Sequence, residues 1–476
     1  MKRILRLAAF GLALHAFLLH PTTTHAADAK PNILYIVSDD LGWKDVSFHG
    51  AADIKTPNLN TLAAGGARLE QFYVQPMCTP TRAALMTGRY PMRYGLQTLV
   101  IPSKGTYGLA LDERTLPEAL KDAGYRTAMV GKWHLGHADR KYWPRQRGFD
   151  YHYGAVIGEI DYFTHDSHGV LDWQRDNKPV KEKGYVTQLL GQDAVKVINA
   201  HDPKTPLFLY LAFTAPHAPY QAPKEYLDRY LHIADPARRS YAAMIACMDD
   251  EIGKVLAALD QKKLRENTLI VWHSDNGGTT DARLAGEGHS AKPPCDNGPL
   301  NGGKGSNYEG GTRVPALANW PGHIKPGTEI KDMIHVVDMF PTLTKLAAAP
   351  AGRGKPLDGL DVWPALSEGK PTGRRELVYN VEPFRAAVRQ GDWKLLWKAV
   401  LPSKIELFNL ATDPNETTNL AAQEPAKVKE LQARIEQLAG EAAKPLFMEA
   451  SVKAIFGGLM GPAPIPTDDN AGTAEP

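Results

Sequence analysis

The sequence predicts an α/β protein with a mostly parallel central sheet flanked by helices, followed by a smaller antiparallel sheet with a packing helix. Two observations lead to this fold class. Short apolar runs alternate with helical patterns over most of the chain, and short strand-like runs between turn residues replace them after about Gly369. Uninterrupted apolar strands are typical of a parallel sheet covered on both faces, and their alternation with helices indicates an α/β architecture.

The larger sheet is predicted from four apolar runs, each of which ends in polar residues. We expect strands at residues 32–38, 125–130, 206–213 and 268–274, and helices at 58–67, 116–123, 188–200 and 241–260. The polar residues that follow these strands are Asp39 and Asp40, Lys132 and His134, His217, and Asp275 with Asn276. Because α/β sheets bind ligands at the carboxyl ends of their strands, these side chains should meet in one site.

The last quarter of the chain predicts a separate, smaller unit. Strand-like runs at 377–380, 384–389, 393–397 and 405–409 precede a helical pattern at 424–442. We therefore expect a larger domain over residues 30–369 and a C-terminal subdomain over 370–445. Residues 446–476 are expected to be a disordered tail, because Gly and Pro recur there and the end is polar.

The N-terminal 26 residues are typical of a secretory signal peptide. A basic start precedes an apolar run from Leu7 to Leu19, and a small-residue cleavage site follows at Ala26. An uncleaved membrane anchor fits less well, since the run is short for a membrane span and His15 interrupts it. The prediction is a secreted or periplasmic protein with no membrane attachment after cleavage.

Charge and cysteine content exclude two further classes. The chain has 476 residues and a formal net charge of +2, and loss of the three basic residues of the signal would lower it to −1. A near-neutral chain without a basic run gives no footprint for nucleic acid. Three cysteines are too few for a disulfide scaffold. Cys247 and Cys295 could pair in an oxidising compartment, but Cys247 flanks an apolar helical stripe, which favours a buried free thiol.

A metal site is indicated by the polar pairs after the first and fourth strands. Asp39, Asp40, Asp275 and Asn276 offer oxygen ligands alone, the set that Ca²⁺ or Mg²⁺ accepts. Adjacent aspartates at a strand end repel each other unless a cation or an arginine lies between them. The alternative is a pair of solvated turns. His273 directly precedes the second pair and is expected to pack against the sheet instead of binding metal.

Three basic segments are candidates for binding an anion. Lys132 and His134 are two residues apart, so an extended backbone would place both on one face. Lys304 lies in the glycine-dense stretch 301–313, which can bring backbone N–H groups and an ammonium group to an anion although it lacks P-loop spacing. His217 is isolated in its loop. The alternatives are a solvated lysine, a flexible loop and a structural histidine.

The segment Cys78-Thr79-Pro80-Thr81-Arg82 places a thiol at the start of a predicted helix. Proline suits the first helical turn, and Gly88 can end the helix. The positive end of the helix dipole and Arg82 would both favour an anion beside Cys78. A small buried cysteine before an ordinary helix is the alternative. This Cys-x-Pro-x-Arg run resembles the sulfatase signature.

The resemblance to sulfatases extends from about Lys30 to Leu420 and implies an alkaline-phosphatase-like fold. It implies that a formylglycine-generating enzyme oxidises Cys78 to formylglycine (3-oxoalanine). It also implies that Ca²⁺ binds Asp39, Asp40, Asp275, Asn276 and the modified Cys78. The residues that fall at the family's sulfate-handling positions are Arg82, Lys132, His134, His217 and Lys304. Stretches such as 131–136 and 310–315 look closest to the arylsulfatase B branch, the N-acetylgalactosamine-4-sulfatases.

The same resemblance implies a division of labour in the reaction. One hydroxyl of the hydrated aldehyde attacks sulfur, while Ca²⁺, Lys132 and Lys304 stabilise charge on the nonbridging oxygens. His217, alone or with Lys304, protonates the departing oxygen. His134 takes a proton from the second hydroxyl, which expels sulfate, and Arg82 holds the site together.

The substrate implied by the resemblance is N-acetylgalactosamine 4-sulfate in chondroitin or dermatan sulfate, with simple aryl sulfates also cleaved. Candidate sugar contacts are Asp161, Tyr162, His165 and Trp173, against the alternative of ordinary loop packing. Three other functions remain open: a sulfatase of different glycan specificity, a phosphonate or phosphate ester hydrolase of the same superfamily, and an inactive carbohydrate-binding relative. An inactive relative should have lost Cys78 or a metal ligand.

Overall fold

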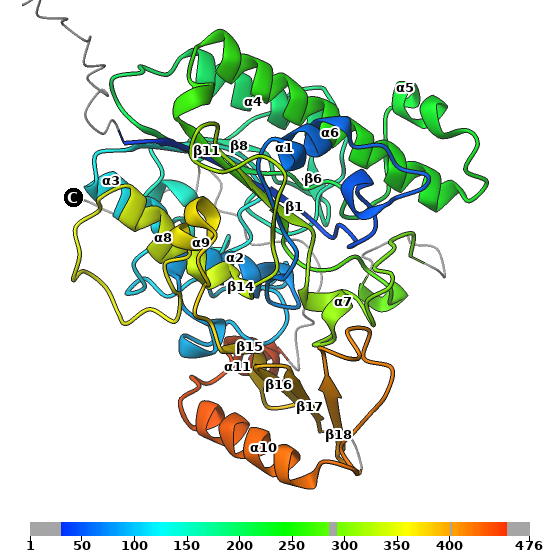
Figure 1. Cartoon of the computed structure of the whole chain (residues 1–476). Helices are drawn as coiled ribbons and strands as arrows, with labels where there is room; N and C mark the ends of the chain where they lie inside the picture. Colours follow the sequence, from blue (N-terminus) through cyan, green and yellow to red (C-terminus); the bar gives the residue numbers. More distant parts are fainter. Residues whose placement is uncertain (1–29, 285–292, 400–401, 455–476) are drawn as a thin grey trace, which may run out of the picture.

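A computed structural model describes residues 30–284, 293–399 and 402–454 (Figure 1). Its central sheet has the strand order β13-β2-β12-β11-β1-β10-β4-β5-β8-β9. The middle of this sheet is parallel and consists of β11 (Thr268–Ser274), β1 (Asn32–Ser38), β10 (Leu207–Ala212), β4 (Arg126–Gly131) and β5 (Tyr151–Gly154). The predicted α/β class with a mostly parallel sheet is confirmed.

Short strands extend the sheet at both edges. They are β12 (Ala316–Asn319), β2 (Ala67–Leu69) and β13 (Thr328–Ile330) beyond β11, and β8 (Gln174–Arg175) and β9 (Lys178–Pro179) beyond β5. β12 runs antiparallel to both β11 and β2, and β8 runs antiparallel to both β5 and β9. The sheet is therefore mixed, with its antiparallel pairs outside the parallel centre.

Helices cover both faces of the sheet, which explains the uninterrupted apolar strands. In β1, Leu34 and Ile36 belong to one core, whereas Ile33, Tyr35 and Val37 belong to the other. Successive side chains of a strand point to opposite faces, so both sets must be apolar. The first core includes α1 (Pro57–Ala64), α4 (Val186–Asn199) and α6 (Pro236–Gln261), and the second includes α2 (Cys78–Thr87), α3 (Leu116–Asp122), α8 (Met339–Leu346) and α9 (Trp363–Glu368) (Figure 1).

The remaining elements are short. They are the helices α5 (Lys224–Leu227) and α7 (Glu309–Thr312) and the strand pairs β3 (Phe72–Tyr73) with β14 (Ile334–His335) and β6 (Asp166–Ser167) with β7 (Val170–Leu171). Helix α6 begins five residues earlier than predicted. Pro236 starts it, and the Asp235 side chain accepts a hydrogen bond from the Ala237 N–H, so a cap and a first-turn proline extend the helix beyond its apolar stripe.

The C-terminal part forms the predicted antiparallel sheet. Its strands are β15 (Glu376–Glu382), β16 (Arg385–Gln390), β17 (Trp393–Lys398) and β18 (Lys404–Asn409), paired in chain order. Helix α10 (Pro425–Gly440) buries Leu431, Ile435 and Leu438 in a core that also contains residues of β15 to β18. The sheet and α10 lie together at one end of the molecule (Figure 1).

The segment after Pro445 corrects one expectation. Instead of a disordered tail from residue 446, the chain forms helix α11 (Leu446–Ala454). Its start is held to the larger domain, because the Leu446 N–H donates to the Gly95 carbonyl at 2.9 Å and the Ala443 N–H donates to the Met92 carbonyl at 2.8 Å. The predicted signal peptide and the tail beyond residue 454 lie outside the described residues. Within those residues, we find no helix of the length and apolar character needed to cross a bilayer.

Candidate active site

The polar residues after β1 and β11 meet at the carboxyl edge of the sheet, as predicted. The two strands are parallel neighbours in which Ser38 pairs with Ser274, so the residues that follow them come side by side. The Asp40 N–H donates to Asp275 Oδ1 at 3.3 Å, and Asn276 Nδ2 donates to Asp40 Oδ1 at 2.8 Å. Asp40 has a φ of 62°, a left-handed backbone that turns the chain sharply at the strand end.

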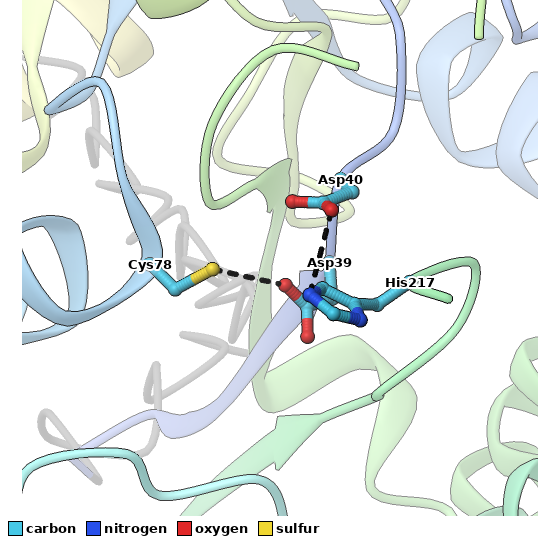
Figure 2. Close-up of side chains that lie close together, drawn as sticks. All are labelled: Asp39, Asp40, Cys78 and His217. Atoms are coloured by element: carbon cyan, nitrogen blue, oxygen red, sulfur yellow. Dashed lines mark hydrogen bonds and ion pairs between the residues drawn. The ribbon is translucent and has the colours of Figure 1, made fainter. Parts of the chain in front are cut away.

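Cys78 is the first residue of α2 and points to the same edge. Its Sγ lies 3.4 Å from Asp39 Oδ1, and its side chain is buried (Figure 2). The Thr81 hydroxyl hydrogen-bonds both the N–H and the carbonyl of Gln75, which fixes the path of the chain into the helix. Gly88 ends α2 in the left-handed conformation, as predicted. Burial and the Asp275 carboxylate raise the pKa of the Cys78 thiol well above its usual value.

Arg82, one turn into α2, joins the thiol helix to the carboxylates. Its Nη2 and Nε donate to Asp275 Oδ2 at 2.8 and 3.1 Å, and its Nη1 donates to the Lys132 carbonyl at 2.9 Å. The guanidinium is buried, and Asp275 raises its pKa against the effect of burial. A single arginine of α2 thus holds the ends of two strands, β11 and β4, and its fork-shaped donors suit this geometry.

Each lysine of the predicted site pairs with one aspartate. Lys132 Nζ donates to Asp39 Oδ2, and Lys304 Nζ donates to Asp40 Oδ2 at 2.8 Å. Burial alone would raise the pKa of Asp40, but Lys304 and His217 lower it below its usual range. The glycine-dense loop therefore brings Lys304 to the strand ends, as the sequence predicted.

The donor set fits a hard divalent cation. One ligand atom each from Asp39, Asp40, Cys78 and His217 lies within 4.8 Å of the others, and all four residues are buried (Figure 2). Asn276 Oδ1 is also buried and lacks a hydrogen-bond partner in the described part of the chain. A buried amide oxygen without a donor is costly unless a cation or water satisfies it. The carboxylate oxygens of Asp39 and Asp40 together with Asn276 Oδ1 suit Ca²⁺ or Mg²⁺, whereas the unmodified Cys78 thiol and the His217 imidazole are not ligands that these cations prefer.

His217, in the loop after β10, faces both Asp40 and Lys304. Its Nε2 lies 3.1 Å from Lys304 Nζ and 3.6 Å from Asp40 Oδ2, and its Nδ1 lies 2.6 Å from the Ala218 carbonyl oxygen. A carbonyl can only accept, so Nδ1 carries the proton and Nε2 presents its lone pair to Lys304. Burial and Lys304 lower the pKa of His217 to about 4. Tyr162 donates to the His217 carbonyl at 2.8 Å and so supports this loop.

His134 follows β4 and is held on three sides. The His134 Nε2 lies 3.1 Å from the Ile101 carbonyl oxygen, and the Thr79 hydroxyl donates to the His134 carbonyl at 3.0 Å. Its Nδ1 is buried and without a hydrogen-bond partner among the described residues. Gly158 lies against the ring so closely that a Cβ there would be 2.2 Å from the His134 Cε1 atom. Burial and Lys132 lower the pKa of His134 well below its usual value.

These groups open onto one cavity of about 200 Å³. Four of the predicted residues line it, namely Cys78, His134, His217 and Lys304, together with Ile101, Pro102, Ser103, Ile157, Gly158, Glu159, His168, Arg283 and Leu284 among others. Four of the six predicted catalytic residues thus share one hollow at the carboxyl edge of the sheet, whereas Arg82 and Lys132 are buried and do not line it.

The cavity is not lined by any of the four candidate sugar contacts, which are Asp161, Tyr162, His165 and Trp173. Tyr162 and Trp173 are fully buried, and Trp173 stacks on His165 with ring centroids 5.0 Å apart. Asp161 accepts hydrogen bonds from the N–H groups of Phe163 and Thr164 at 2.9 and 2.8 Å. Their contact with a sugar stays a prediction. His273 packs inside the sheet against Tyr35, as expected. Cys247 and Cys295 are both free thiols, and Cys247 is buried, as its apolar helical stripe favoured.

Two residues that support the site were not identified from the sequence. Asp172 is fully buried and accepts the backbone N–H groups of Val156 and Ile157 at 3.0 and 2.7 Å, which fixes the cavity wall at 157–159. Thr279 donates its hydroxyl to Asp40 Oδ2 at 3.0 Å. No sequence motif marks Asp172, because its partners are backbone groups that any residue supplies. Thr279 could have been identified, since it lies only three residues after Asn276 in the sequence.

Comparison with known proteins identifies the family. The family described as Sulfatase matches residues 31–349, and the family described as N-sulphoglucosamine sulphohydrolase, C-terminal, matches residues 303–442. Arylsulfatase J of Mus musculus is 36% identical over 472 residues, covering 88% of this chain and 77% of the relative. N-acetylgalactosamine-6-sulfatase of Mus musculus is 35% identical over 393 residues, covering 78% and 73%.

The fold comparison agrees with the sequence comparison. The crystal structure of Ps i-CgsB in complex with k-i-k-neocarrahexaose superposes with a TM-score of 0.80 at 34% identity, covering 88% of this chain and 94% of that one. The predicted sulfatase resemblance and the alkaline-phosphatase-like fold are confirmed. This chain belongs to the sulfatase family and is a sulfuric ester hydrolase.

Proposed function

We propose that this enzyme releases sulfate from a sulfated sugar, using a formylglycine made from Cys78 and a Ca²⁺ ion bound beside it. The observation that carries the proposal is the single buried cluster of Cys78, Asp39, Asp40 and His217, with Lys304 in contact. An acid–base pair, two ammonium groups and a carboxylate site converge where one sulfate group would fit. A nucleophile and its charge-stabilising groups need this proximity.

Asp39, Asp40, Asp275 and Asn276 would hold the metal. Asn276 Oδ1 is buried and lacks a hydrogen-bond partner among the described residues, and Lys132 and Lys304 each donate to one of the two adjacent aspartates. When bound, Ca²⁺ would draw charge from the nonbridging sulfate oxygens, and the aldehyde hydrate at position 78 would supply the nucleophilic oxygen. Arg82 would keep Asp275 in place through its two hydrogen bonds.

The two histidines suit opposite roles. The Nε2 of His134 faces a carbonyl and therefore carries the proton, which leaves a lone pair on Nδ1 to accept a proton. His217 Nε2 lies 3.1 Å from Lys304 Nζ, so a proton can pass between them and reach the departing sugar oxygen. Lys132 and Lys304 would bind the sulfate oxygens.

For the substrate, we propose N-acetylgalactosamine 4-sulfate within chondroitin or dermatan sulfate. A sugar substrate is supported by one relative named for N-acetylgalactosamine 6-sulfate and by a structural neighbour solved with a neocarrahexaose. The position of the sulfate rests on sequence stretches that look closest to arylsulfatase B. The predicted signal peptide would place the enzyme where such polysaccharides occur.

A substrate panel tests the proposal. We expect sulfate release from a 4-sulfated galactosamine disaccharide to be faster than from the 6-sulfated isomer, measured side by side by ion chromatography. Equal rates or a preference for the 6-sulfate would overturn the assignment of position. Phosphate and phosphonate monoesters of the same aryl alcohol should be cleaved far more slowly than the aryl sulfate, and the reverse order would favour the phosphonate hydrolase alternative.

The modification of Cys78 is tested separately. We expect mass spectrometry of the tryptic peptide carrying residue 78 to show formylglycine in active enzyme, since an unmodified thiol lacks the second hydroxyl that expels sulfate. Expression without a formylglycine-generating enzyme should give folded protein with almost no turnover. Full activity with an intact thiol at position 78 would contradict the proposal.

A further inference from the structure

A second cavity continues the active-site cavity outward. It measures about 490 Å³ and shares Arg283 and Leu284 with the first. Two further positions are sequence neighbours across the boundary: Leu99 lines the second cavity beside Val100 of the first, and Gly305 lines it beside Lys304. The catalytic hollow therefore opens into a longer groove.

The far wall of this groove comes from the C-terminal sheet and α11. Glu382 at the end of β15, Phe384 in the turn and Arg385 at the start of β16 line it from one hairpin, and Phe447 lines it from α11. Arg385 donates to the Gly305 carbonyl, next to Lys304, and forms an ion pair with Glu382. The hairpin is thus tied to the catalytic loop, and its distance from the reacting group is fixed.

Phe384 is the most informative residue of this wall. Its side chain is 56% exposed at the hairpin tip, although the sheet behind it has a well-filled core. An exposed aromatic ring beside an active site offers an apolar face on which a sugar ring can stack, with little conformational entropy to lose. Arg283 stands at the junction of the two cavities and is paired with the exposed Asp281. Exposed ion pairs are weak, so Arg283 can turn to an anionic sugar at little cost.

We propose that this second cavity, which we call the outer cavity, binds the sugars adjoining the sulfated one, so that the enzyme prefers a sulfated oligosaccharide to a single sulfated sugar. The inference rests on the proposed function and assigns the C-terminal hairpin to substrate recognition. The first cavity, at about 200 Å³, is smaller than ordinary ligand sites of roughly 300–1,000 Å³. Joined to the outer cavity, it reaches that range.

Steady-state kinetics on substrates of three lengths tests the proposal. The substrates are an aryl sulfate, a 4-sulfated disaccharide and a chondroitin 4-sulfate hexasaccharide. We expect wild-type kcat/KM to be higher for the hexasaccharide than for the disaccharide. Phe384→Ala should lower kcat/KM for the hexasaccharide about tenfold, through KM, because it removes a stacking surface. The same variant should leave aryl sulfate turnover unchanged.

Leu231→Ala is the control, because Leu231 is an apolar residue that is 63% exposed and lines neither cavity. It should leave all three substrates unaffected. Equal kcat/KM for both saccharides, or a Phe384→Ala loss that is the same for aryl sulfate and hexasaccharide, would overturn the proposal.

A competition assay separates this inference from the substrate assignment. Chondroitin 4-sulfate hexasaccharide and k-i-k-neocarrahexaose are each added as inhibitors of aryl sulfate hydrolysis. A hexasaccharide that inhibits more strongly than the disaccharide, with a weaker effect in Phe384→Ala, supports the outer cavity even if the 4-sulfate is not the bond cleaved. Failure of both hexasaccharides to inhibit wild-type enzyme more strongly than the disaccharide refutes it.

Discussion

At the scale of single residues, Asp275 links the proposed metal site to α2, the helix that begins at Cys78. Its Oδ2 accepts two bonds from Arg82 and its Oδ1 accepts the Asp40 N–H. Removing the carboxylate would leave the buried guanidinium without its partner, a change that typically costs about 3–5 kcal/mol. A loss of activity in Asp275→Ala could therefore reflect unfolding as well as metal loss, and the conservative amide is the better probe.

We expect Asp275→Asn to remain folded, to lose most of its bound Ca²⁺ and to lose turnover, because one negative charge leaves a site that concentrates carboxylates. Elemental analysis and circular dichroism measure the two properties separately. Asp281→Asn, at an exposed carboxylate far less buried than Asp275, serves as the control for metal content. Wild-type turnover after complete chelation would rule out the metal site.

Gly158 has no side chain, and this allows the His134 ring to lie against its backbone. A Cβ at this position would lie 2.2 Å from the His134 ring, inside any real contact distance. We expect Gly158→Ala to displace the ring and lower kcat at least tenfold for aryl sulfates and sugars alike, with KM changing less. Gly440→Ala is the control, since nothing lies within 4 Å of a Cβ there and its activity should equal wild type. Unchanged kcat in Gly158→Ala would show that the ring position is not critical.

At the scale of elements, the segment between β5 and β8 carries one wall of the site and depends on Asp172. Burial raises the pKa of this carboxyl to about 6, although two backbone N–H groups favour its ionised form. The folded state therefore keeps a proton that the unfolded state releases near pH 4. By linkage, this group's contribution to stability falls as pH rises from about 4 to 6, by on the order of 3 kcal/mol in all.

Asp172→Asn should remove this dependence while keeping one acceptor oxygen, so that one of the two backbone N–H groups, which bond different carboxylate oxygens, loses its partner at every pH. We expect the free energy of unfolding, measured by urea titration at several pH values, to fall less between pH 4 and 6 in the variant than in wild type. Asp392→Asn, at a side chain 61% exposed, should retain the wild-type slope. Identical slopes for Asp172→Asn and wild type would contradict the assigned protonation.

The elements that sequence reasoning predicts are those with a strong local signal. β1 and β11 are seven-residue apolar runs and match their predicted bounds, and α2 begins at Cys78 because proline and Gly88 mark its ends. The edge strands β8 and β9 have two residues each, too short for any periodicity. Helix α11 was not predicted, because backbone hydrogen bonds to Met92 and Gly95 hold its start and the composition of the segment does not reveal them.

The same distinction applies to the site. The strand-end residues were predictable because parallel strands bring their carboxyl ends together, whatever their separation in sequence. Lys304 was predictable as part of a glycine-dense loop. Asp172 and Gly158 were not, since one binds backbone groups and the other is needed for its missing side chain.

At the scale of the whole molecule, a buried charge cluster joins the larger domain to the C-terminal sheet. Lys394 on β17 lies 2.9 Å from Glu309 Oε1 at the start of α7 and 2.8 Å from Glu416 Oε1 after β18. Glu416 also accepts the Glu309 N–H at 2.7 Å. Burial and the proximity of Glu309 raise the pKa of Glu416 to about 7. One ammonium group thus holds two carboxylates at the base of the loop that carries Lys304.

Replacing this ammonium should weaken both the junction and the outer cavity. Lys394→Met keeps the length of the side chain but removes the ammonium that both carboxylates share, so that Glu416 loses its cation and Glu309 keeps the more distant Arg313 at 4.0 Å. We expect this change to lower the free energy of unfolding by about 3–5 kcal/mol. Lys404→Met on β18 is the matched control, because its ammonium pairs with Glu406 at a 55% exposed position and should contribute about 1 kcal/mol or less.

Urea unfolding of both variants measures this difference, and kinetics extends it to function. If the cluster fixes the hairpin relative to the catalytic loop, folded Lys394→Met should lose kcat/KM for a sulfated hexasaccharide more than for an aryl sulfate, whereas Lys404→Met should lose neither. The aryl sulfate reports on the catalytic cavity alone, and the hexasaccharide reports on its alignment with the C-terminal sheet. Equal stability of the two variants would mean that the larger domain and the sheet are held together without this charge cluster.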